Sequence, residues 1–413
     1  MKIIGLYGAT GSSDFGDYAM MVHNVQDILE LSDDVEISIF TPDKNMTLQN
    51  LNDNLLNQYL MNRIKVVEEP KIRRKFIEKA IDYICNKLIN KKPFFESKYK
   101  KTISGKLDYL NCEFLNSIKK LDVMLFNGGG YLQHSWRYSN NIFALQMVVA
   151  GYLGKPVYML GNSIGPMKKW KYCIADALPY INEIMIRDGK NYTAKLLDEL
   201  NYRNFFCGPD DLFFVNDCYD SVPMYENYVV IELMSWIDKA AHGGKYVVNR
   251  LAELLDHILQ EGRNVVLTIF DNADNKAIEY IDYLKKKSSC PEKVFAYTEI
   301  KSMYEIFSIY KHCMFSISFK YHPLILALGS NKPCIGVICD NDGYYEGKLK
   351  GACDNADVVP EKHIIHIDDI DDTKLINMYD ELKEMADIVD SKNHKKLYDI
   401  RKRYLRRIVL NEE

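Results

Sequence analysis

Short runs of apolar residues alternate along this chain with longer stretches in which apolar positions recur every three or four residues. The runs predict β-strands and the stretches predict α-helices, because each spacing places apolar side chains on one face. In the first half, strands are predicted at residues 2–7, 35–40, 121–126 and 157–160, and helices at 17–31 and 141–152. Such alternation is typical of a parallel sheet covered by helices.

A second series of the same kind follows a polar segment, residues 221–227, that contains Pro223. Its predicted strands are residues 228–233, 264–270, 314–318 and 334–338, and its helices are 245–262 and 302–310. We therefore expect two α/β domains, residues 1–224 and 225–373, with a cleft between them. Residues 374–413 predict a helical segment that could cross back to the first domain.

Residues 63–106 form a basic insertion in the first domain, with 14 Lys and Arg against 5 Asp and Glu. Between residues 72 and 89, apolar positions recur at helical spacing with basic residues between them. A basic amphipathic helix either packs on the protein with a solvated basic face or lies on an anionic membrane surface. We favour the packed helix and keep peripheral contact with the inner membrane face as the alternative.

Composition narrows the classes of protein. The 413 residues are 47% hydrophobic and 27% charged, which excludes fibrous and disordered chains. A formal net charge of −4 gives no case for nucleic-acid binding. The ten cysteines are scattered without a C-x-x-C pair, which indicates reduced thiols and neither a zinc site nor a redox pair. No signal peptide or membrane span is recognisable, so we expect a cytoplasmic protein.

Three glycine-rich segments follow predicted strands, where parallel sheets bind ligands. They are Asp14-Phe15-Gly16-Asp17, Asn127-Gly128-Gly129-Gly130 and Gly161-Asn162-Ser163-Ile164-Gly165-Pro166. Glycine lets the backbone approach a ligand, and a following helix offers unpaired N–H groups to an anion. At such a helix start, Asp17 is either a cap or a reacting carboxylate.

The third segment also matches the G-x-S-x-G pattern of serine hydrolases. That pattern requires a helix beginning directly behind the serine, and Pro166 pushes the residue before it away from helical angles. We therefore do not favour a hydrolase.

Charged side chains gather near the ends of other predicted strands. Arg187 precedes Asp188, as either a surface pair or an anion clamp with its orienting carboxylate. Lys320 and His322 follow the strand at 314–318, and Lys348 lies in residues 344–351, which we predict to be a loop. Together with the glycines, these side chains suit a small, multiply charged anion.

Taken in chain order, these segments resemble the polysaccharide pyruvyl transferase family. That family typically shows an Asn-x-Gly-Asp loop, a triple glycine, a G-x-x-I-G-P stretch, an Arg-Asp pair, an Asp-Pro element and an R-x-H box. The corresponding segments here are residues 14–17, 128–130, 161–166, 187–188, 209–210 and 320–322.

The resemblance implies two Rossmann-like domains with parallel sheets in a GT-B-like arrangement. It also implies transfer of a pyruvyl group from phosphoenolpyruvate to two hydroxyls of a sugar, in a polysaccharide or a lipid-linked precursor. The product would be a cyclic ketal, made during cell-surface polysaccharide biosynthesis. This chemistry demands no metal and no organic cofactor, only phosphoenolpyruvate as co-substrate.

The resemblance and the chemistry together suggest roles for the candidate residues. His322 would protonate the methylene carbon of the donor, and Asp17 or Asp188 would take the proton of a sugar hydroxyl. Three cations would neutralise the donor's carboxylate and phosphate. The expected substrate-binding residues are Arg187, Lys320, Lys348, Gly16, Gly128, Gly129, Gly130, Asn162 and Ser163.

Three positions depart from the family pattern. Asp14 stands where asparagine is usual, Lys320 replaces the arginine of the R-x-H box, and Met234 stands where an arginine often begins the second domain. Lysine keeps the charge but loses the planar fork that grips a carboxylate or phosphate. Two alternatives therefore stay open: a GT-B-type glycosyltransferase with a nucleotide-sugar donor, and a non-catalytic sugar- or phosphate-binding relative.

Overall fold

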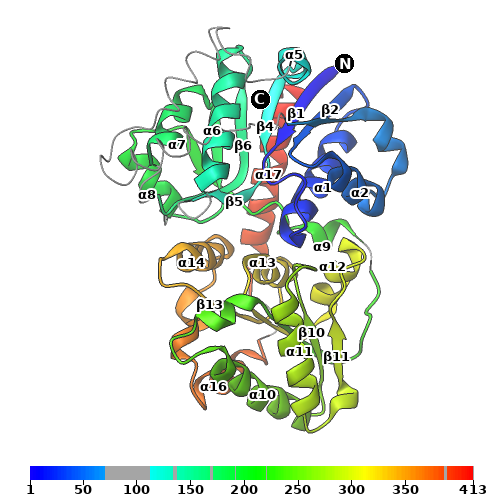
Figure 1. Cartoon of the computed structure of the whole chain (residues 1–413), viewed down its shortest axis with the longest axis vertical. Coiled ribbons are helices and arrows are strands. Elements are labelled where there is room, and N and C mark those ends of the chain that lie inside the picture. The colour runs from blue at the N-terminus through cyan, green and yellow to red at the C-terminus, as the bar shows by residue number, and fades with distance from the viewer. Residues whose placement is uncertain are drawn as a thin grey trace, which may run out of the picture.

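The computed structural model describes residues 1–69, 112–133, 137–167, 171–190, 192–219, 221–385 and 388–412. These residues form two α/β domains stacked along the long axis of the molecule (Figure 1). Every strand pairing within the two sheets is parallel. The expected pair of Rossmann-like domains with parallel sheets is therefore confirmed.

The first sheet has the strand order β3-β2-β1-β4-β6-β7-β8, with β5 paired to β6. Its strands are β1 (Lys2–Tyr7), β2 (Val35–Thr41), β3 (Ile64–Glu68), β4 (Val123–Phe126), β5 (Gly129–Leu132), β6 (Val157–Ile164), β7 (Glu183–Ile186) and β8 (Phe205–Cys207). The helices are α1 (Phe15–Glu30), α2 (Lys44–Asn54), α5 (Cys112–Lys120), α6 (Arg137–Tyr152), α7 (Lys171–Ala177), α8 (Tyr192–Glu199) and α9 (Val215–Cys218). The strand order reverses between β1 and β4, where open sheets of this kind form a crevice.

The second sheet has the order β11-β10-β9-β12-β13-β14, so it too reverses beside its first strand. Its strands are β9 (Tyr228–Glu232), β10 (Asn264–Thr268), β11 (Val294–Tyr297), β12 (Phe315–Ser318), β13 (Cys334–Ile338) and β14 (Ile364–His366). The helices that follow are α10 (Gly244–Gln260), α11 (Asn275–Lys287), α12 (Met303–His312), α13 (Tyr321–Gly329), α14 (Tyr344–Ala356), α15 (Pro360–His363), α16 (Lys374–Leu382) and α17 (Ser391–Leu410).

The central strands are buried on both faces, which explains their nearly continuous apolar sequences. All five residues of β9 and all four of β12 are buried. The helices cover them with one apolar face, as in α10, whose buried positions recur every three or four residues. Each sheet therefore presents its polar, ligand-facing residues only where its strands end.

Each strand predicted from the sequence lies on an observed strand, but two predictions at element ends were wrong. Strand β6 continues to Ile164, so most of the third glycine-rich segment is strand and not loop. The predicted loop at 344–351 is the start of helix α14. Gly347 and Gly351 give that helix a smooth face, because an added Cβ would lie 1.7 Å from the ring of Tyr192 and 2.5 Å from the Cα of Asp188.

The C-terminal segment is two helices, α16 and α17, and α17 returns to the first domain (Figure 1). The Tyr404 hydroxyl on α17 donates to the carbonyls of Met159 and Glu183 at 3.3 and 3.2 Å. Residues 64–68 of the basic insertion form strand β3, whereas its predicted amphipathic helix lies outside the described residues. In the described part of the chain, no helix is both long enough and apolar enough to span a membrane.

Candidate functional site

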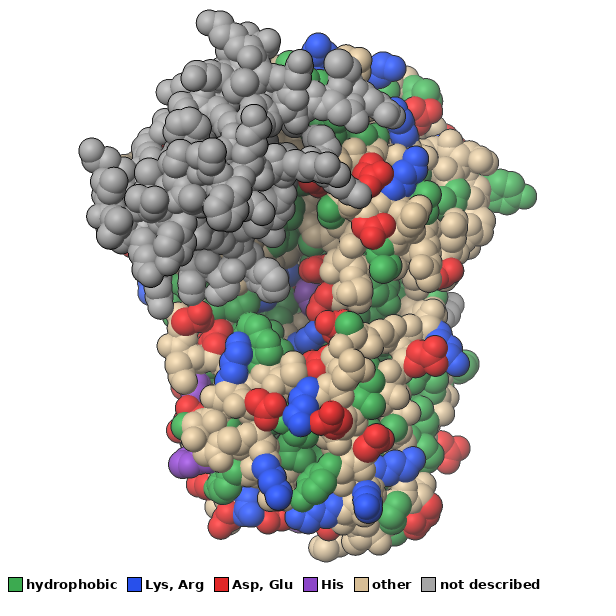
Figure 2. Space-filling model, viewed as in Figure 1, with side chains coloured by type: hydrophobic (Ala, Val, Ile, Leu, Met, Phe, Trp, Pro, Cys, Tyr) green, Lys and Arg blue, Asp and Glu red, His purple; other side chains and the backbone are tan. Residues whose placement is uncertain are grey.

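The candidate site lies where the carboxyl ends of the two sheets face each other. In the space-filling view the surface is hollowed between the two domains, with acidic, basic and histidine side chains around the hollow (Figure 2). The expected interdomain cleft is therefore present. The residues that the sequence predicted arrive there from the ends of β1, β4, β6 and β7 in one domain and from the segment after β12 and helix α14 in the other.

His322 packs directly on Gly16 across the two domains. A Cβ at Gly16 would lie 1.7 Å from His322 Nδ1, so only glycine at this position leaves room for the ring. His322 is the second residue of α13, and its Nε2 is buried without a hydrogen-bond partner. Burial, together with the nearby charges of Arg187, Lys348 and Lys320, lowers the pKa of His322 well below its usual value. The imidazole of His322 is therefore neutral at pH 7 in the protein alone.

Arg187 is a buried cation with one unoccupied donor. It is 1% exposed, forms an ion pair with Asp210 and donates from Nε to Ser163 Oγ at 3.2 Å. Its guanidinium lies 4.4 Å from the ring centre of Tyr321, and its Nη2 has no partner. Burial works against the charge, but Tyr321 and Asp210 outweigh it and raise the pKa of Arg187. Arg187 thus offers a fixed positive charge to a ligand.

Asp188 is not the carboxylate that orients Arg187. It accepts hydrogen bonds from the hydroxyl and the backbone N–H of Thr193, at 2.7 and 3.3 Å. Burial raises its pKa to about 6, and its Oδ1 has no partner. Arg187 is therefore oriented by Asp210 and not by the adjacent Asp188.

Lys348 reaches the triple glycine from α14. Its Nζ donates to the hydroxyl of Tyr344 at 2.9 Å, and that hydroxyl donates to the carbonyl of Gly130 at 3.0 Å. The ammonium also lies 4.8 Å from the ring centre of Tyr321. Burial, and then the charge of Arg187, lower the pKa of Lys348 to about 7.

At two positions of the triple glycine, Gly128 and Gly130, a side chain would collide with a neighbouring group. A Cβ at Gly128 would lie 2.6 Å from Asp211 Oδ2, which accepts from the Gly128 N–H at 2.8 Å. A Cβ at Gly130 would lie 2.7 Å from the Tyr344 hydroxyl and 2.9 Å from Lys348 Nζ. Gly129 has φ +152°, within the region that favours glycine. The segment therefore brings the backbone of one domain against a cation of the other.

Asn162 and Ser163 are buried in strand β6, where they bond to other residues of the site. Asn162 Nδ2 donates to the carbonyl of Asn127 at 3.1 Å, and Ser163 Oγ accepts from Arg187. Since Ser163 lies inside a strand and faces an arginine, it has neither the turn nor the base that a hydrolase nucleophile needs.

Lys320 is already paired with Asp14 across the domains. Its Nζ lies 2.9 Å from Asp14 Oδ2, and the backbone N–H groups of Phe319 and Lys320 both donate to Glu232 Oε2 at 2.8 Å. Glu232 is fully buried, and burial raises its pKa to about 7. The two departures at 14 and 320 therefore neutralise each other, whereas Met234 is buried in the hydrophobic core.

Asp17 lies near the start of α1, where it is partly exposed. Burial and the neighbouring charge of Asp14 raise its pKa to about 7, while Ser12, Lys348 and Arg187 act in the opposite sense. The helix cap is supplied by Asp14, whose Oδ1 accepts from the Gly16 N–H at 3.1 Å. Asp17 is therefore free of the capping role and is poised to exchange a proton near neutral pH.

Sequence reasoning missed several residues of this site. Tyr321 and Tyr344 were overlooked because aromatic residues usually indicate core, and Glu232 because it ends an apolar strand. Asp211 follows Asp210, which had been singled out only through the family pattern. A pair of adjacent acidic residues beyond a short strand and a glycine was the available signal.

Outside the cleft, His257, Glu261 and Asp380 bring three potential metal ligands together. Lys383 already lies between them, with its Nζ paired to Glu261 and 2.7 Å from Asp380 Oδ1. This group is better described as a salt-bridge cluster on α10 and α16 than as a metal site.

Comparison with solved structures supports the fold. The chain is 13% identical to UDP-GlcNAc 2-epimerase from Methanocaldococcus jannaschii, with a TM-score of 0.56 over 97% of this chain and 99% of that one. It is 12% identical to S. aureus MnaA, solved with UDP, with a TM-score of 0.55 over 100% and 98%. At such identities the likeness concerns the fold alone, and that fold is a two-domain, GT-B-like arrangement. No curated protein gave a match.

The fold and the interdomain site thus define a GT-B-like protein with a cationic cleft. Residues 14–341 match the profile of the polysaccharide pyruvyl transferase family, which covers most of the chain. The chain therefore belongs to this family.

Proposed function

We propose that this protein transfers the pyruvyl group of phosphoenolpyruvate to two hydroxyls of a sugar, forming a cyclic ketal and phosphate in the synthesis of a cell-surface polysaccharide. The observation that carries the proposal is the meeting of Arg187, Lys348 and a neutral His322 between the two sheets. Arg187 Nη2 and His322 Nε2 are both buried and lack partners. Buried donors without partners are costly unless a ligand completes them.

Phosphoenolpyruvate matches these cations because it carries both a carboxylate and a phosphate. Arg187 and Lys348 are the donor-binding cations in this proposal, and the glycines at 16 and 128–130 let the donor approach the backbone. Lys320 contributes charge from its pair with Asp14. Arg187 carries a permanent positive charge, and Lys348, whose pKa is about 7, becomes fully charged when an anion binds. In a buried cleft these charges stabilise a multiply charged donor much more than they would in water.

His322 is the proposed general acid. Burial and the neighbouring cations lower the pKa of His322, so it must gain its proton when the donor binds. A phosphate beside the ring favours the charged imidazole, because opposite charges stabilise each other. The proton then passes to the methylene carbon of the donor, which becomes a methyl group and leaves a cation at the central carbon.

Two sugar hydroxyls complete the ketal. The first attacks the central carbon and gives its proton to a base, for which Asp17 is the better placed, since Asp188 is occupied by Thr193. The bond from the central carbon to the phosphate oxygen then breaks, and the second hydroxyl closes the ring. Of the two hydroxyl protons, one replaces the proton that His322 delivered and the other leaves with phosphate.

Calorimetric titration with phosphoenolpyruvate, followed by a phosphate-release assay with a panel of sugars, tests the proposal. Binding to the wild type that is lost in Arg187→Met, with turnover lost in His322→Ala, would support it. Absence of phosphoenolpyruvate binding to the folded wild type would contradict it. Phosphoenolpyruvate binding without phosphate release from any acceptor would favour a non-catalytic relative.

A glycosyltransferase with a nucleotide-sugar donor is the second candidate. It is favoured by the structural likeness to M. jannaschii UDP-GlcNAc 2-epimerase, which has been solved in complex with UDP-GlcNAc and UDP. Titration with UDP and UDP-sugars distinguishes the two. Tight UDP binding together with no response to phosphoenolpyruvate would replace the pyruvyl transfer by sugar transfer.

The acceptor is proposed to be a sugar of a polysaccharide or of a lipid-linked precursor, with the protein itself cytoplasmic. The excess of basic residues at 63–106 motivates peripheral contact with the inner membrane face as the alternative to a packed helix. Co-sedimentation with vesicles of anionic lipid, repeated at increasing salt, distinguishes the two. Binding that weakens with salt would support the membrane contact, whereas no binding at low salt would support the packed helix.

A further inference from the structure

Helix α17 lies against the first domain, although it follows the second domain in the chain (Figure 1). Besides Tyr404, the helix offers the carbonyl of Ile408 to Lys2 Nζ at 2.7 Å, and Arg407 pairs with Glu183. It begins at Ser391, beyond the residues 14–341 that match the family profile.

Arg401 lies on the inner face of α17, where it is 7% exposed. Its Nη1 pairs with Asp27 on α1, and its Nη2 donates to Asn24 Oδ1 at 2.8 Å. Its Nε lies 4.0 Å from Asp211 Oδ1. One guanidinium therefore links a helix of the first domain to the aspartate behind the triple glycine.

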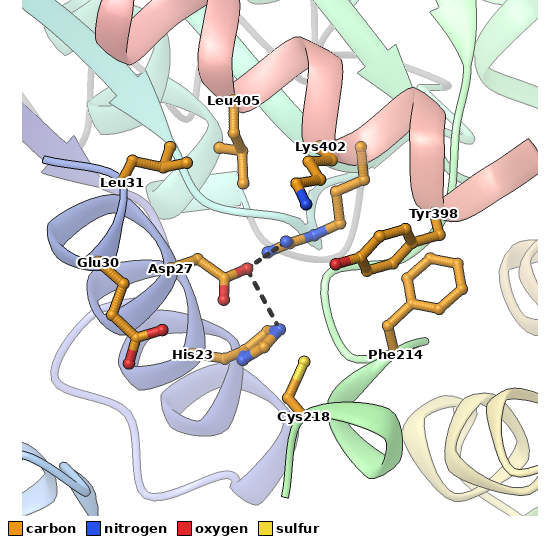
Figure 3. Close-up of a pocket in the computed structure, with 10 residues that line it drawn as sticks. His23, Asp27, Glu30, Leu31, Phe214, Cys218, Tyr398, Lys402 and Leu405 are labelled. Carbon is orange, nitrogen blue, oxygen red and sulfur yellow. Dashed lines mark hydrogen bonds and ion pairs between the residues drawn. The ribbon is translucent and has the colours of Figure 1, made fainter. Parts of the chain in front are cut away.

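A pocket of about 170 Å³ lies on the outer side of this contact, between α1, α9 and α17. Figure 3 shows His23 and Asp27 of α1 facing Tyr398 and Lys402 of α17 across it. Asp27 and Arg401 both line the pocket. Asn24 and Asp211, the other two contacts of the guanidinium, are buried and do not line it.

Asp211 carries the connection to the cleft. Its Oδ2 accepts from Asn24 Nδ2 at 2.7 Å and from the Gly128 N–H at 2.8 Å. The same Asn24 nitrogen donates to Asn127 Oδ1 at 3.0 Å. Arg401, Asn24 and Asp211 therefore fix the backbone at 127–128, two residues before Gly130 meets Lys348.

The charges explain why an arginine is needed at this point. Asp210 and Asp211 are adjacent and both buried, but Asp210 is paired with Arg187. Burial raises the pKa of Asp211, and Arg401 is the strongest influence that lowers it. Loss of Arg401 would therefore raise the pKa of Asp211 further and favour its protonated form. That form has one acceptor oxygen fewer for the N–H groups of Asn24 and Gly128.

We propose that Arg401 is a positioning residue of the candidate site: it fixes Asn24 and Asp211, which hold the triple-glycine segment, so that helix α17 completes the cleft from behind. Its effect on turnover rests on the proposed function. Its effect on the order of residues 127–130 does not.

Hydrogen exchange at residues 123–133 tests the positioning directly, in the full chain without ligand. Arg401→Met should speed exchange of the Gly128 amide by about tenfold or more, since its acceptor loses a buried charged partner. Arg401→Lys, which keeps the charge, should have a smaller effect. Arg407→Met is the matched control, because it removes another ion pair of α17 and should leave Gly128 protected.

A second comparison keeps the test decisive if Arg401→Met does not fold. Asp27→Asn removes the pocket-side partner of Arg401 and leaves the contacts with Asn24 and Asp211, so Gly128 should stay protected. Asp211→Asn removes the carboxylate itself and should expose Gly128. Equal exchange at Gly128 in all folded variants would overturn the proposal, as would faster exchange confined to α1 and α17.

Turnover of phosphoenolpyruvate supplies the functional readout. Arg401→Met should lower kcat/KM by about tenfold or more, with part of the loss restored in Arg401→Lys and none seen in Arg407→Met. If wild-type protein releases no phosphate, the proposed function fails while the exchange result still decides the positioning role. Normal turnover by Arg401→Met would show that α17 serves only to hold the domains.

Discussion

At the scale of single residues, the cations of the cleft differ in how fully they are already compensated. Arg187 has Asp210, and Lys320 has Asp14. Lys348 donates to a tyrosine hydroxyl, and the described residues place no carboxylate within ion-pair distance of it. Lys348 is therefore the cation whose charge depends most on what enters the cleft.

Donor affinity should consequently fall as the pH rises above 7. Burial lowers the pKa of Lys348 to about 7, so above this pH the amine is mostly neutral and must bind a proton to meet an anion. Asp17 acquires its negative charge in the same range and acts in the same direction. From the Lys348 proton alone, the Kd for phosphoenolpyruvate should weaken by up to about tenfold per pH unit between pH 7 and 9, and the proton that His322 must gain on binding adds to this dependence.

Calorimetric titration in buffers of different ionisation enthalpy measures both the affinity and the proton uptake. Lys348→Met should bind weakly at every pH and keep only the part of the dependence that His322 and Asp17 supply, and Asp17→Asn should flatten it in part. A wild-type Kd that does not change from pH 7 to 9 would contradict the role given to Lys348.

The pair formed by Asp14 and Lys320 leads to a second prediction. Asp14→Asn removes a negative charge beside an anionic donor and releases Lys320, so it should tighten phosphoenolpyruvate binding by about fivefold, or ~1 kcal/mol. Lys320→Met should weaken binding much less than Arg187→Met does. Titration of the three variants under one buffer decides this, and weaker binding by Asp14→Asn would show that Asp14 itself supports the donor.

Which carboxylate pairs with which cation could not be predicted from neighbouring positions in the sequence. Arg187 and Asp188 are adjacent, but in an extended chain successive side chains point to opposite sides. Arg187 therefore turns to Asp210 beyond the next strand, and Asp188 turns to Thr193. The sequence identifies strand ends and charged residue types, whereas the partners depend on the twist and order of the sheet.

At the scale of elements, glycines determine how closely the two domains meet. Gly16 at the start of α1 leaves room for His322 of α13, and Gly130 of β5 leaves room for Lys348 of α14. The long buried strands were predictable because parallel sheets need continuous apolar runs. Short strands such as β5 and β8 were not, since three or four residues carry little periodic signal. Helix α14 was taken for a loop because its packing glycines resemble turn residues.

We therefore expect Gly16→Ala to lower turnover much more than it lowers the stability of the fold. Its Cβ would lie 1.7 Å from His322 Nδ1, so the imidazole must leave its place. We expect turnover to fall by about 100-fold or more, with a stability loss of about 1–3 kcal/mol from overpacking.

Gly262→Ala is a matched control, because it introduces backbone strain without a steric collision. Gly262 has φ +81° and open space around it, so alanine there should cost about 1 kcal/mol and leave turnover unchanged. Denaturant unfolding and the phosphate-release assay compare the two variants. Normal turnover by Gly16→Ala would contradict the placement of His322 against this helix start.

At the scale of the whole molecule, two sheets that reverse their strand order beside their first strands face each other across one cleft. This much followed from the sequence, because alternating strands and helices predict parallel sheets and parallel sheets bind ligands at their carboxyl ends. The sequence did not predict how firmly the two domains are joined. The start of α1 does much of this: the Phe15 N–H donates to the carbonyl of Phe270 at 3.0 Å, and the centre of the Phe15 ring lies 4.8 Å from that of Phe270 and 5.9 Å from that of Phe307.

Phe15 therefore belongs to the first domain in sequence and to the second in packing, and its truncation should uncouple the two. We expect wild-type protein to unfold in one calorimetric transition. Phe15→Ala should lose about 3–5 kcal/mol and split that transition in two, since the lost contacts lie between the domains. Phe40→Ala is the control, because Phe40 is equally buried but packs on Phe114 within the first domain. It should lower the Tm while keeping a single transition. A single transition in Phe15→Ala would mean that the return of α17, and not the start of α1, makes the two domains unfold together.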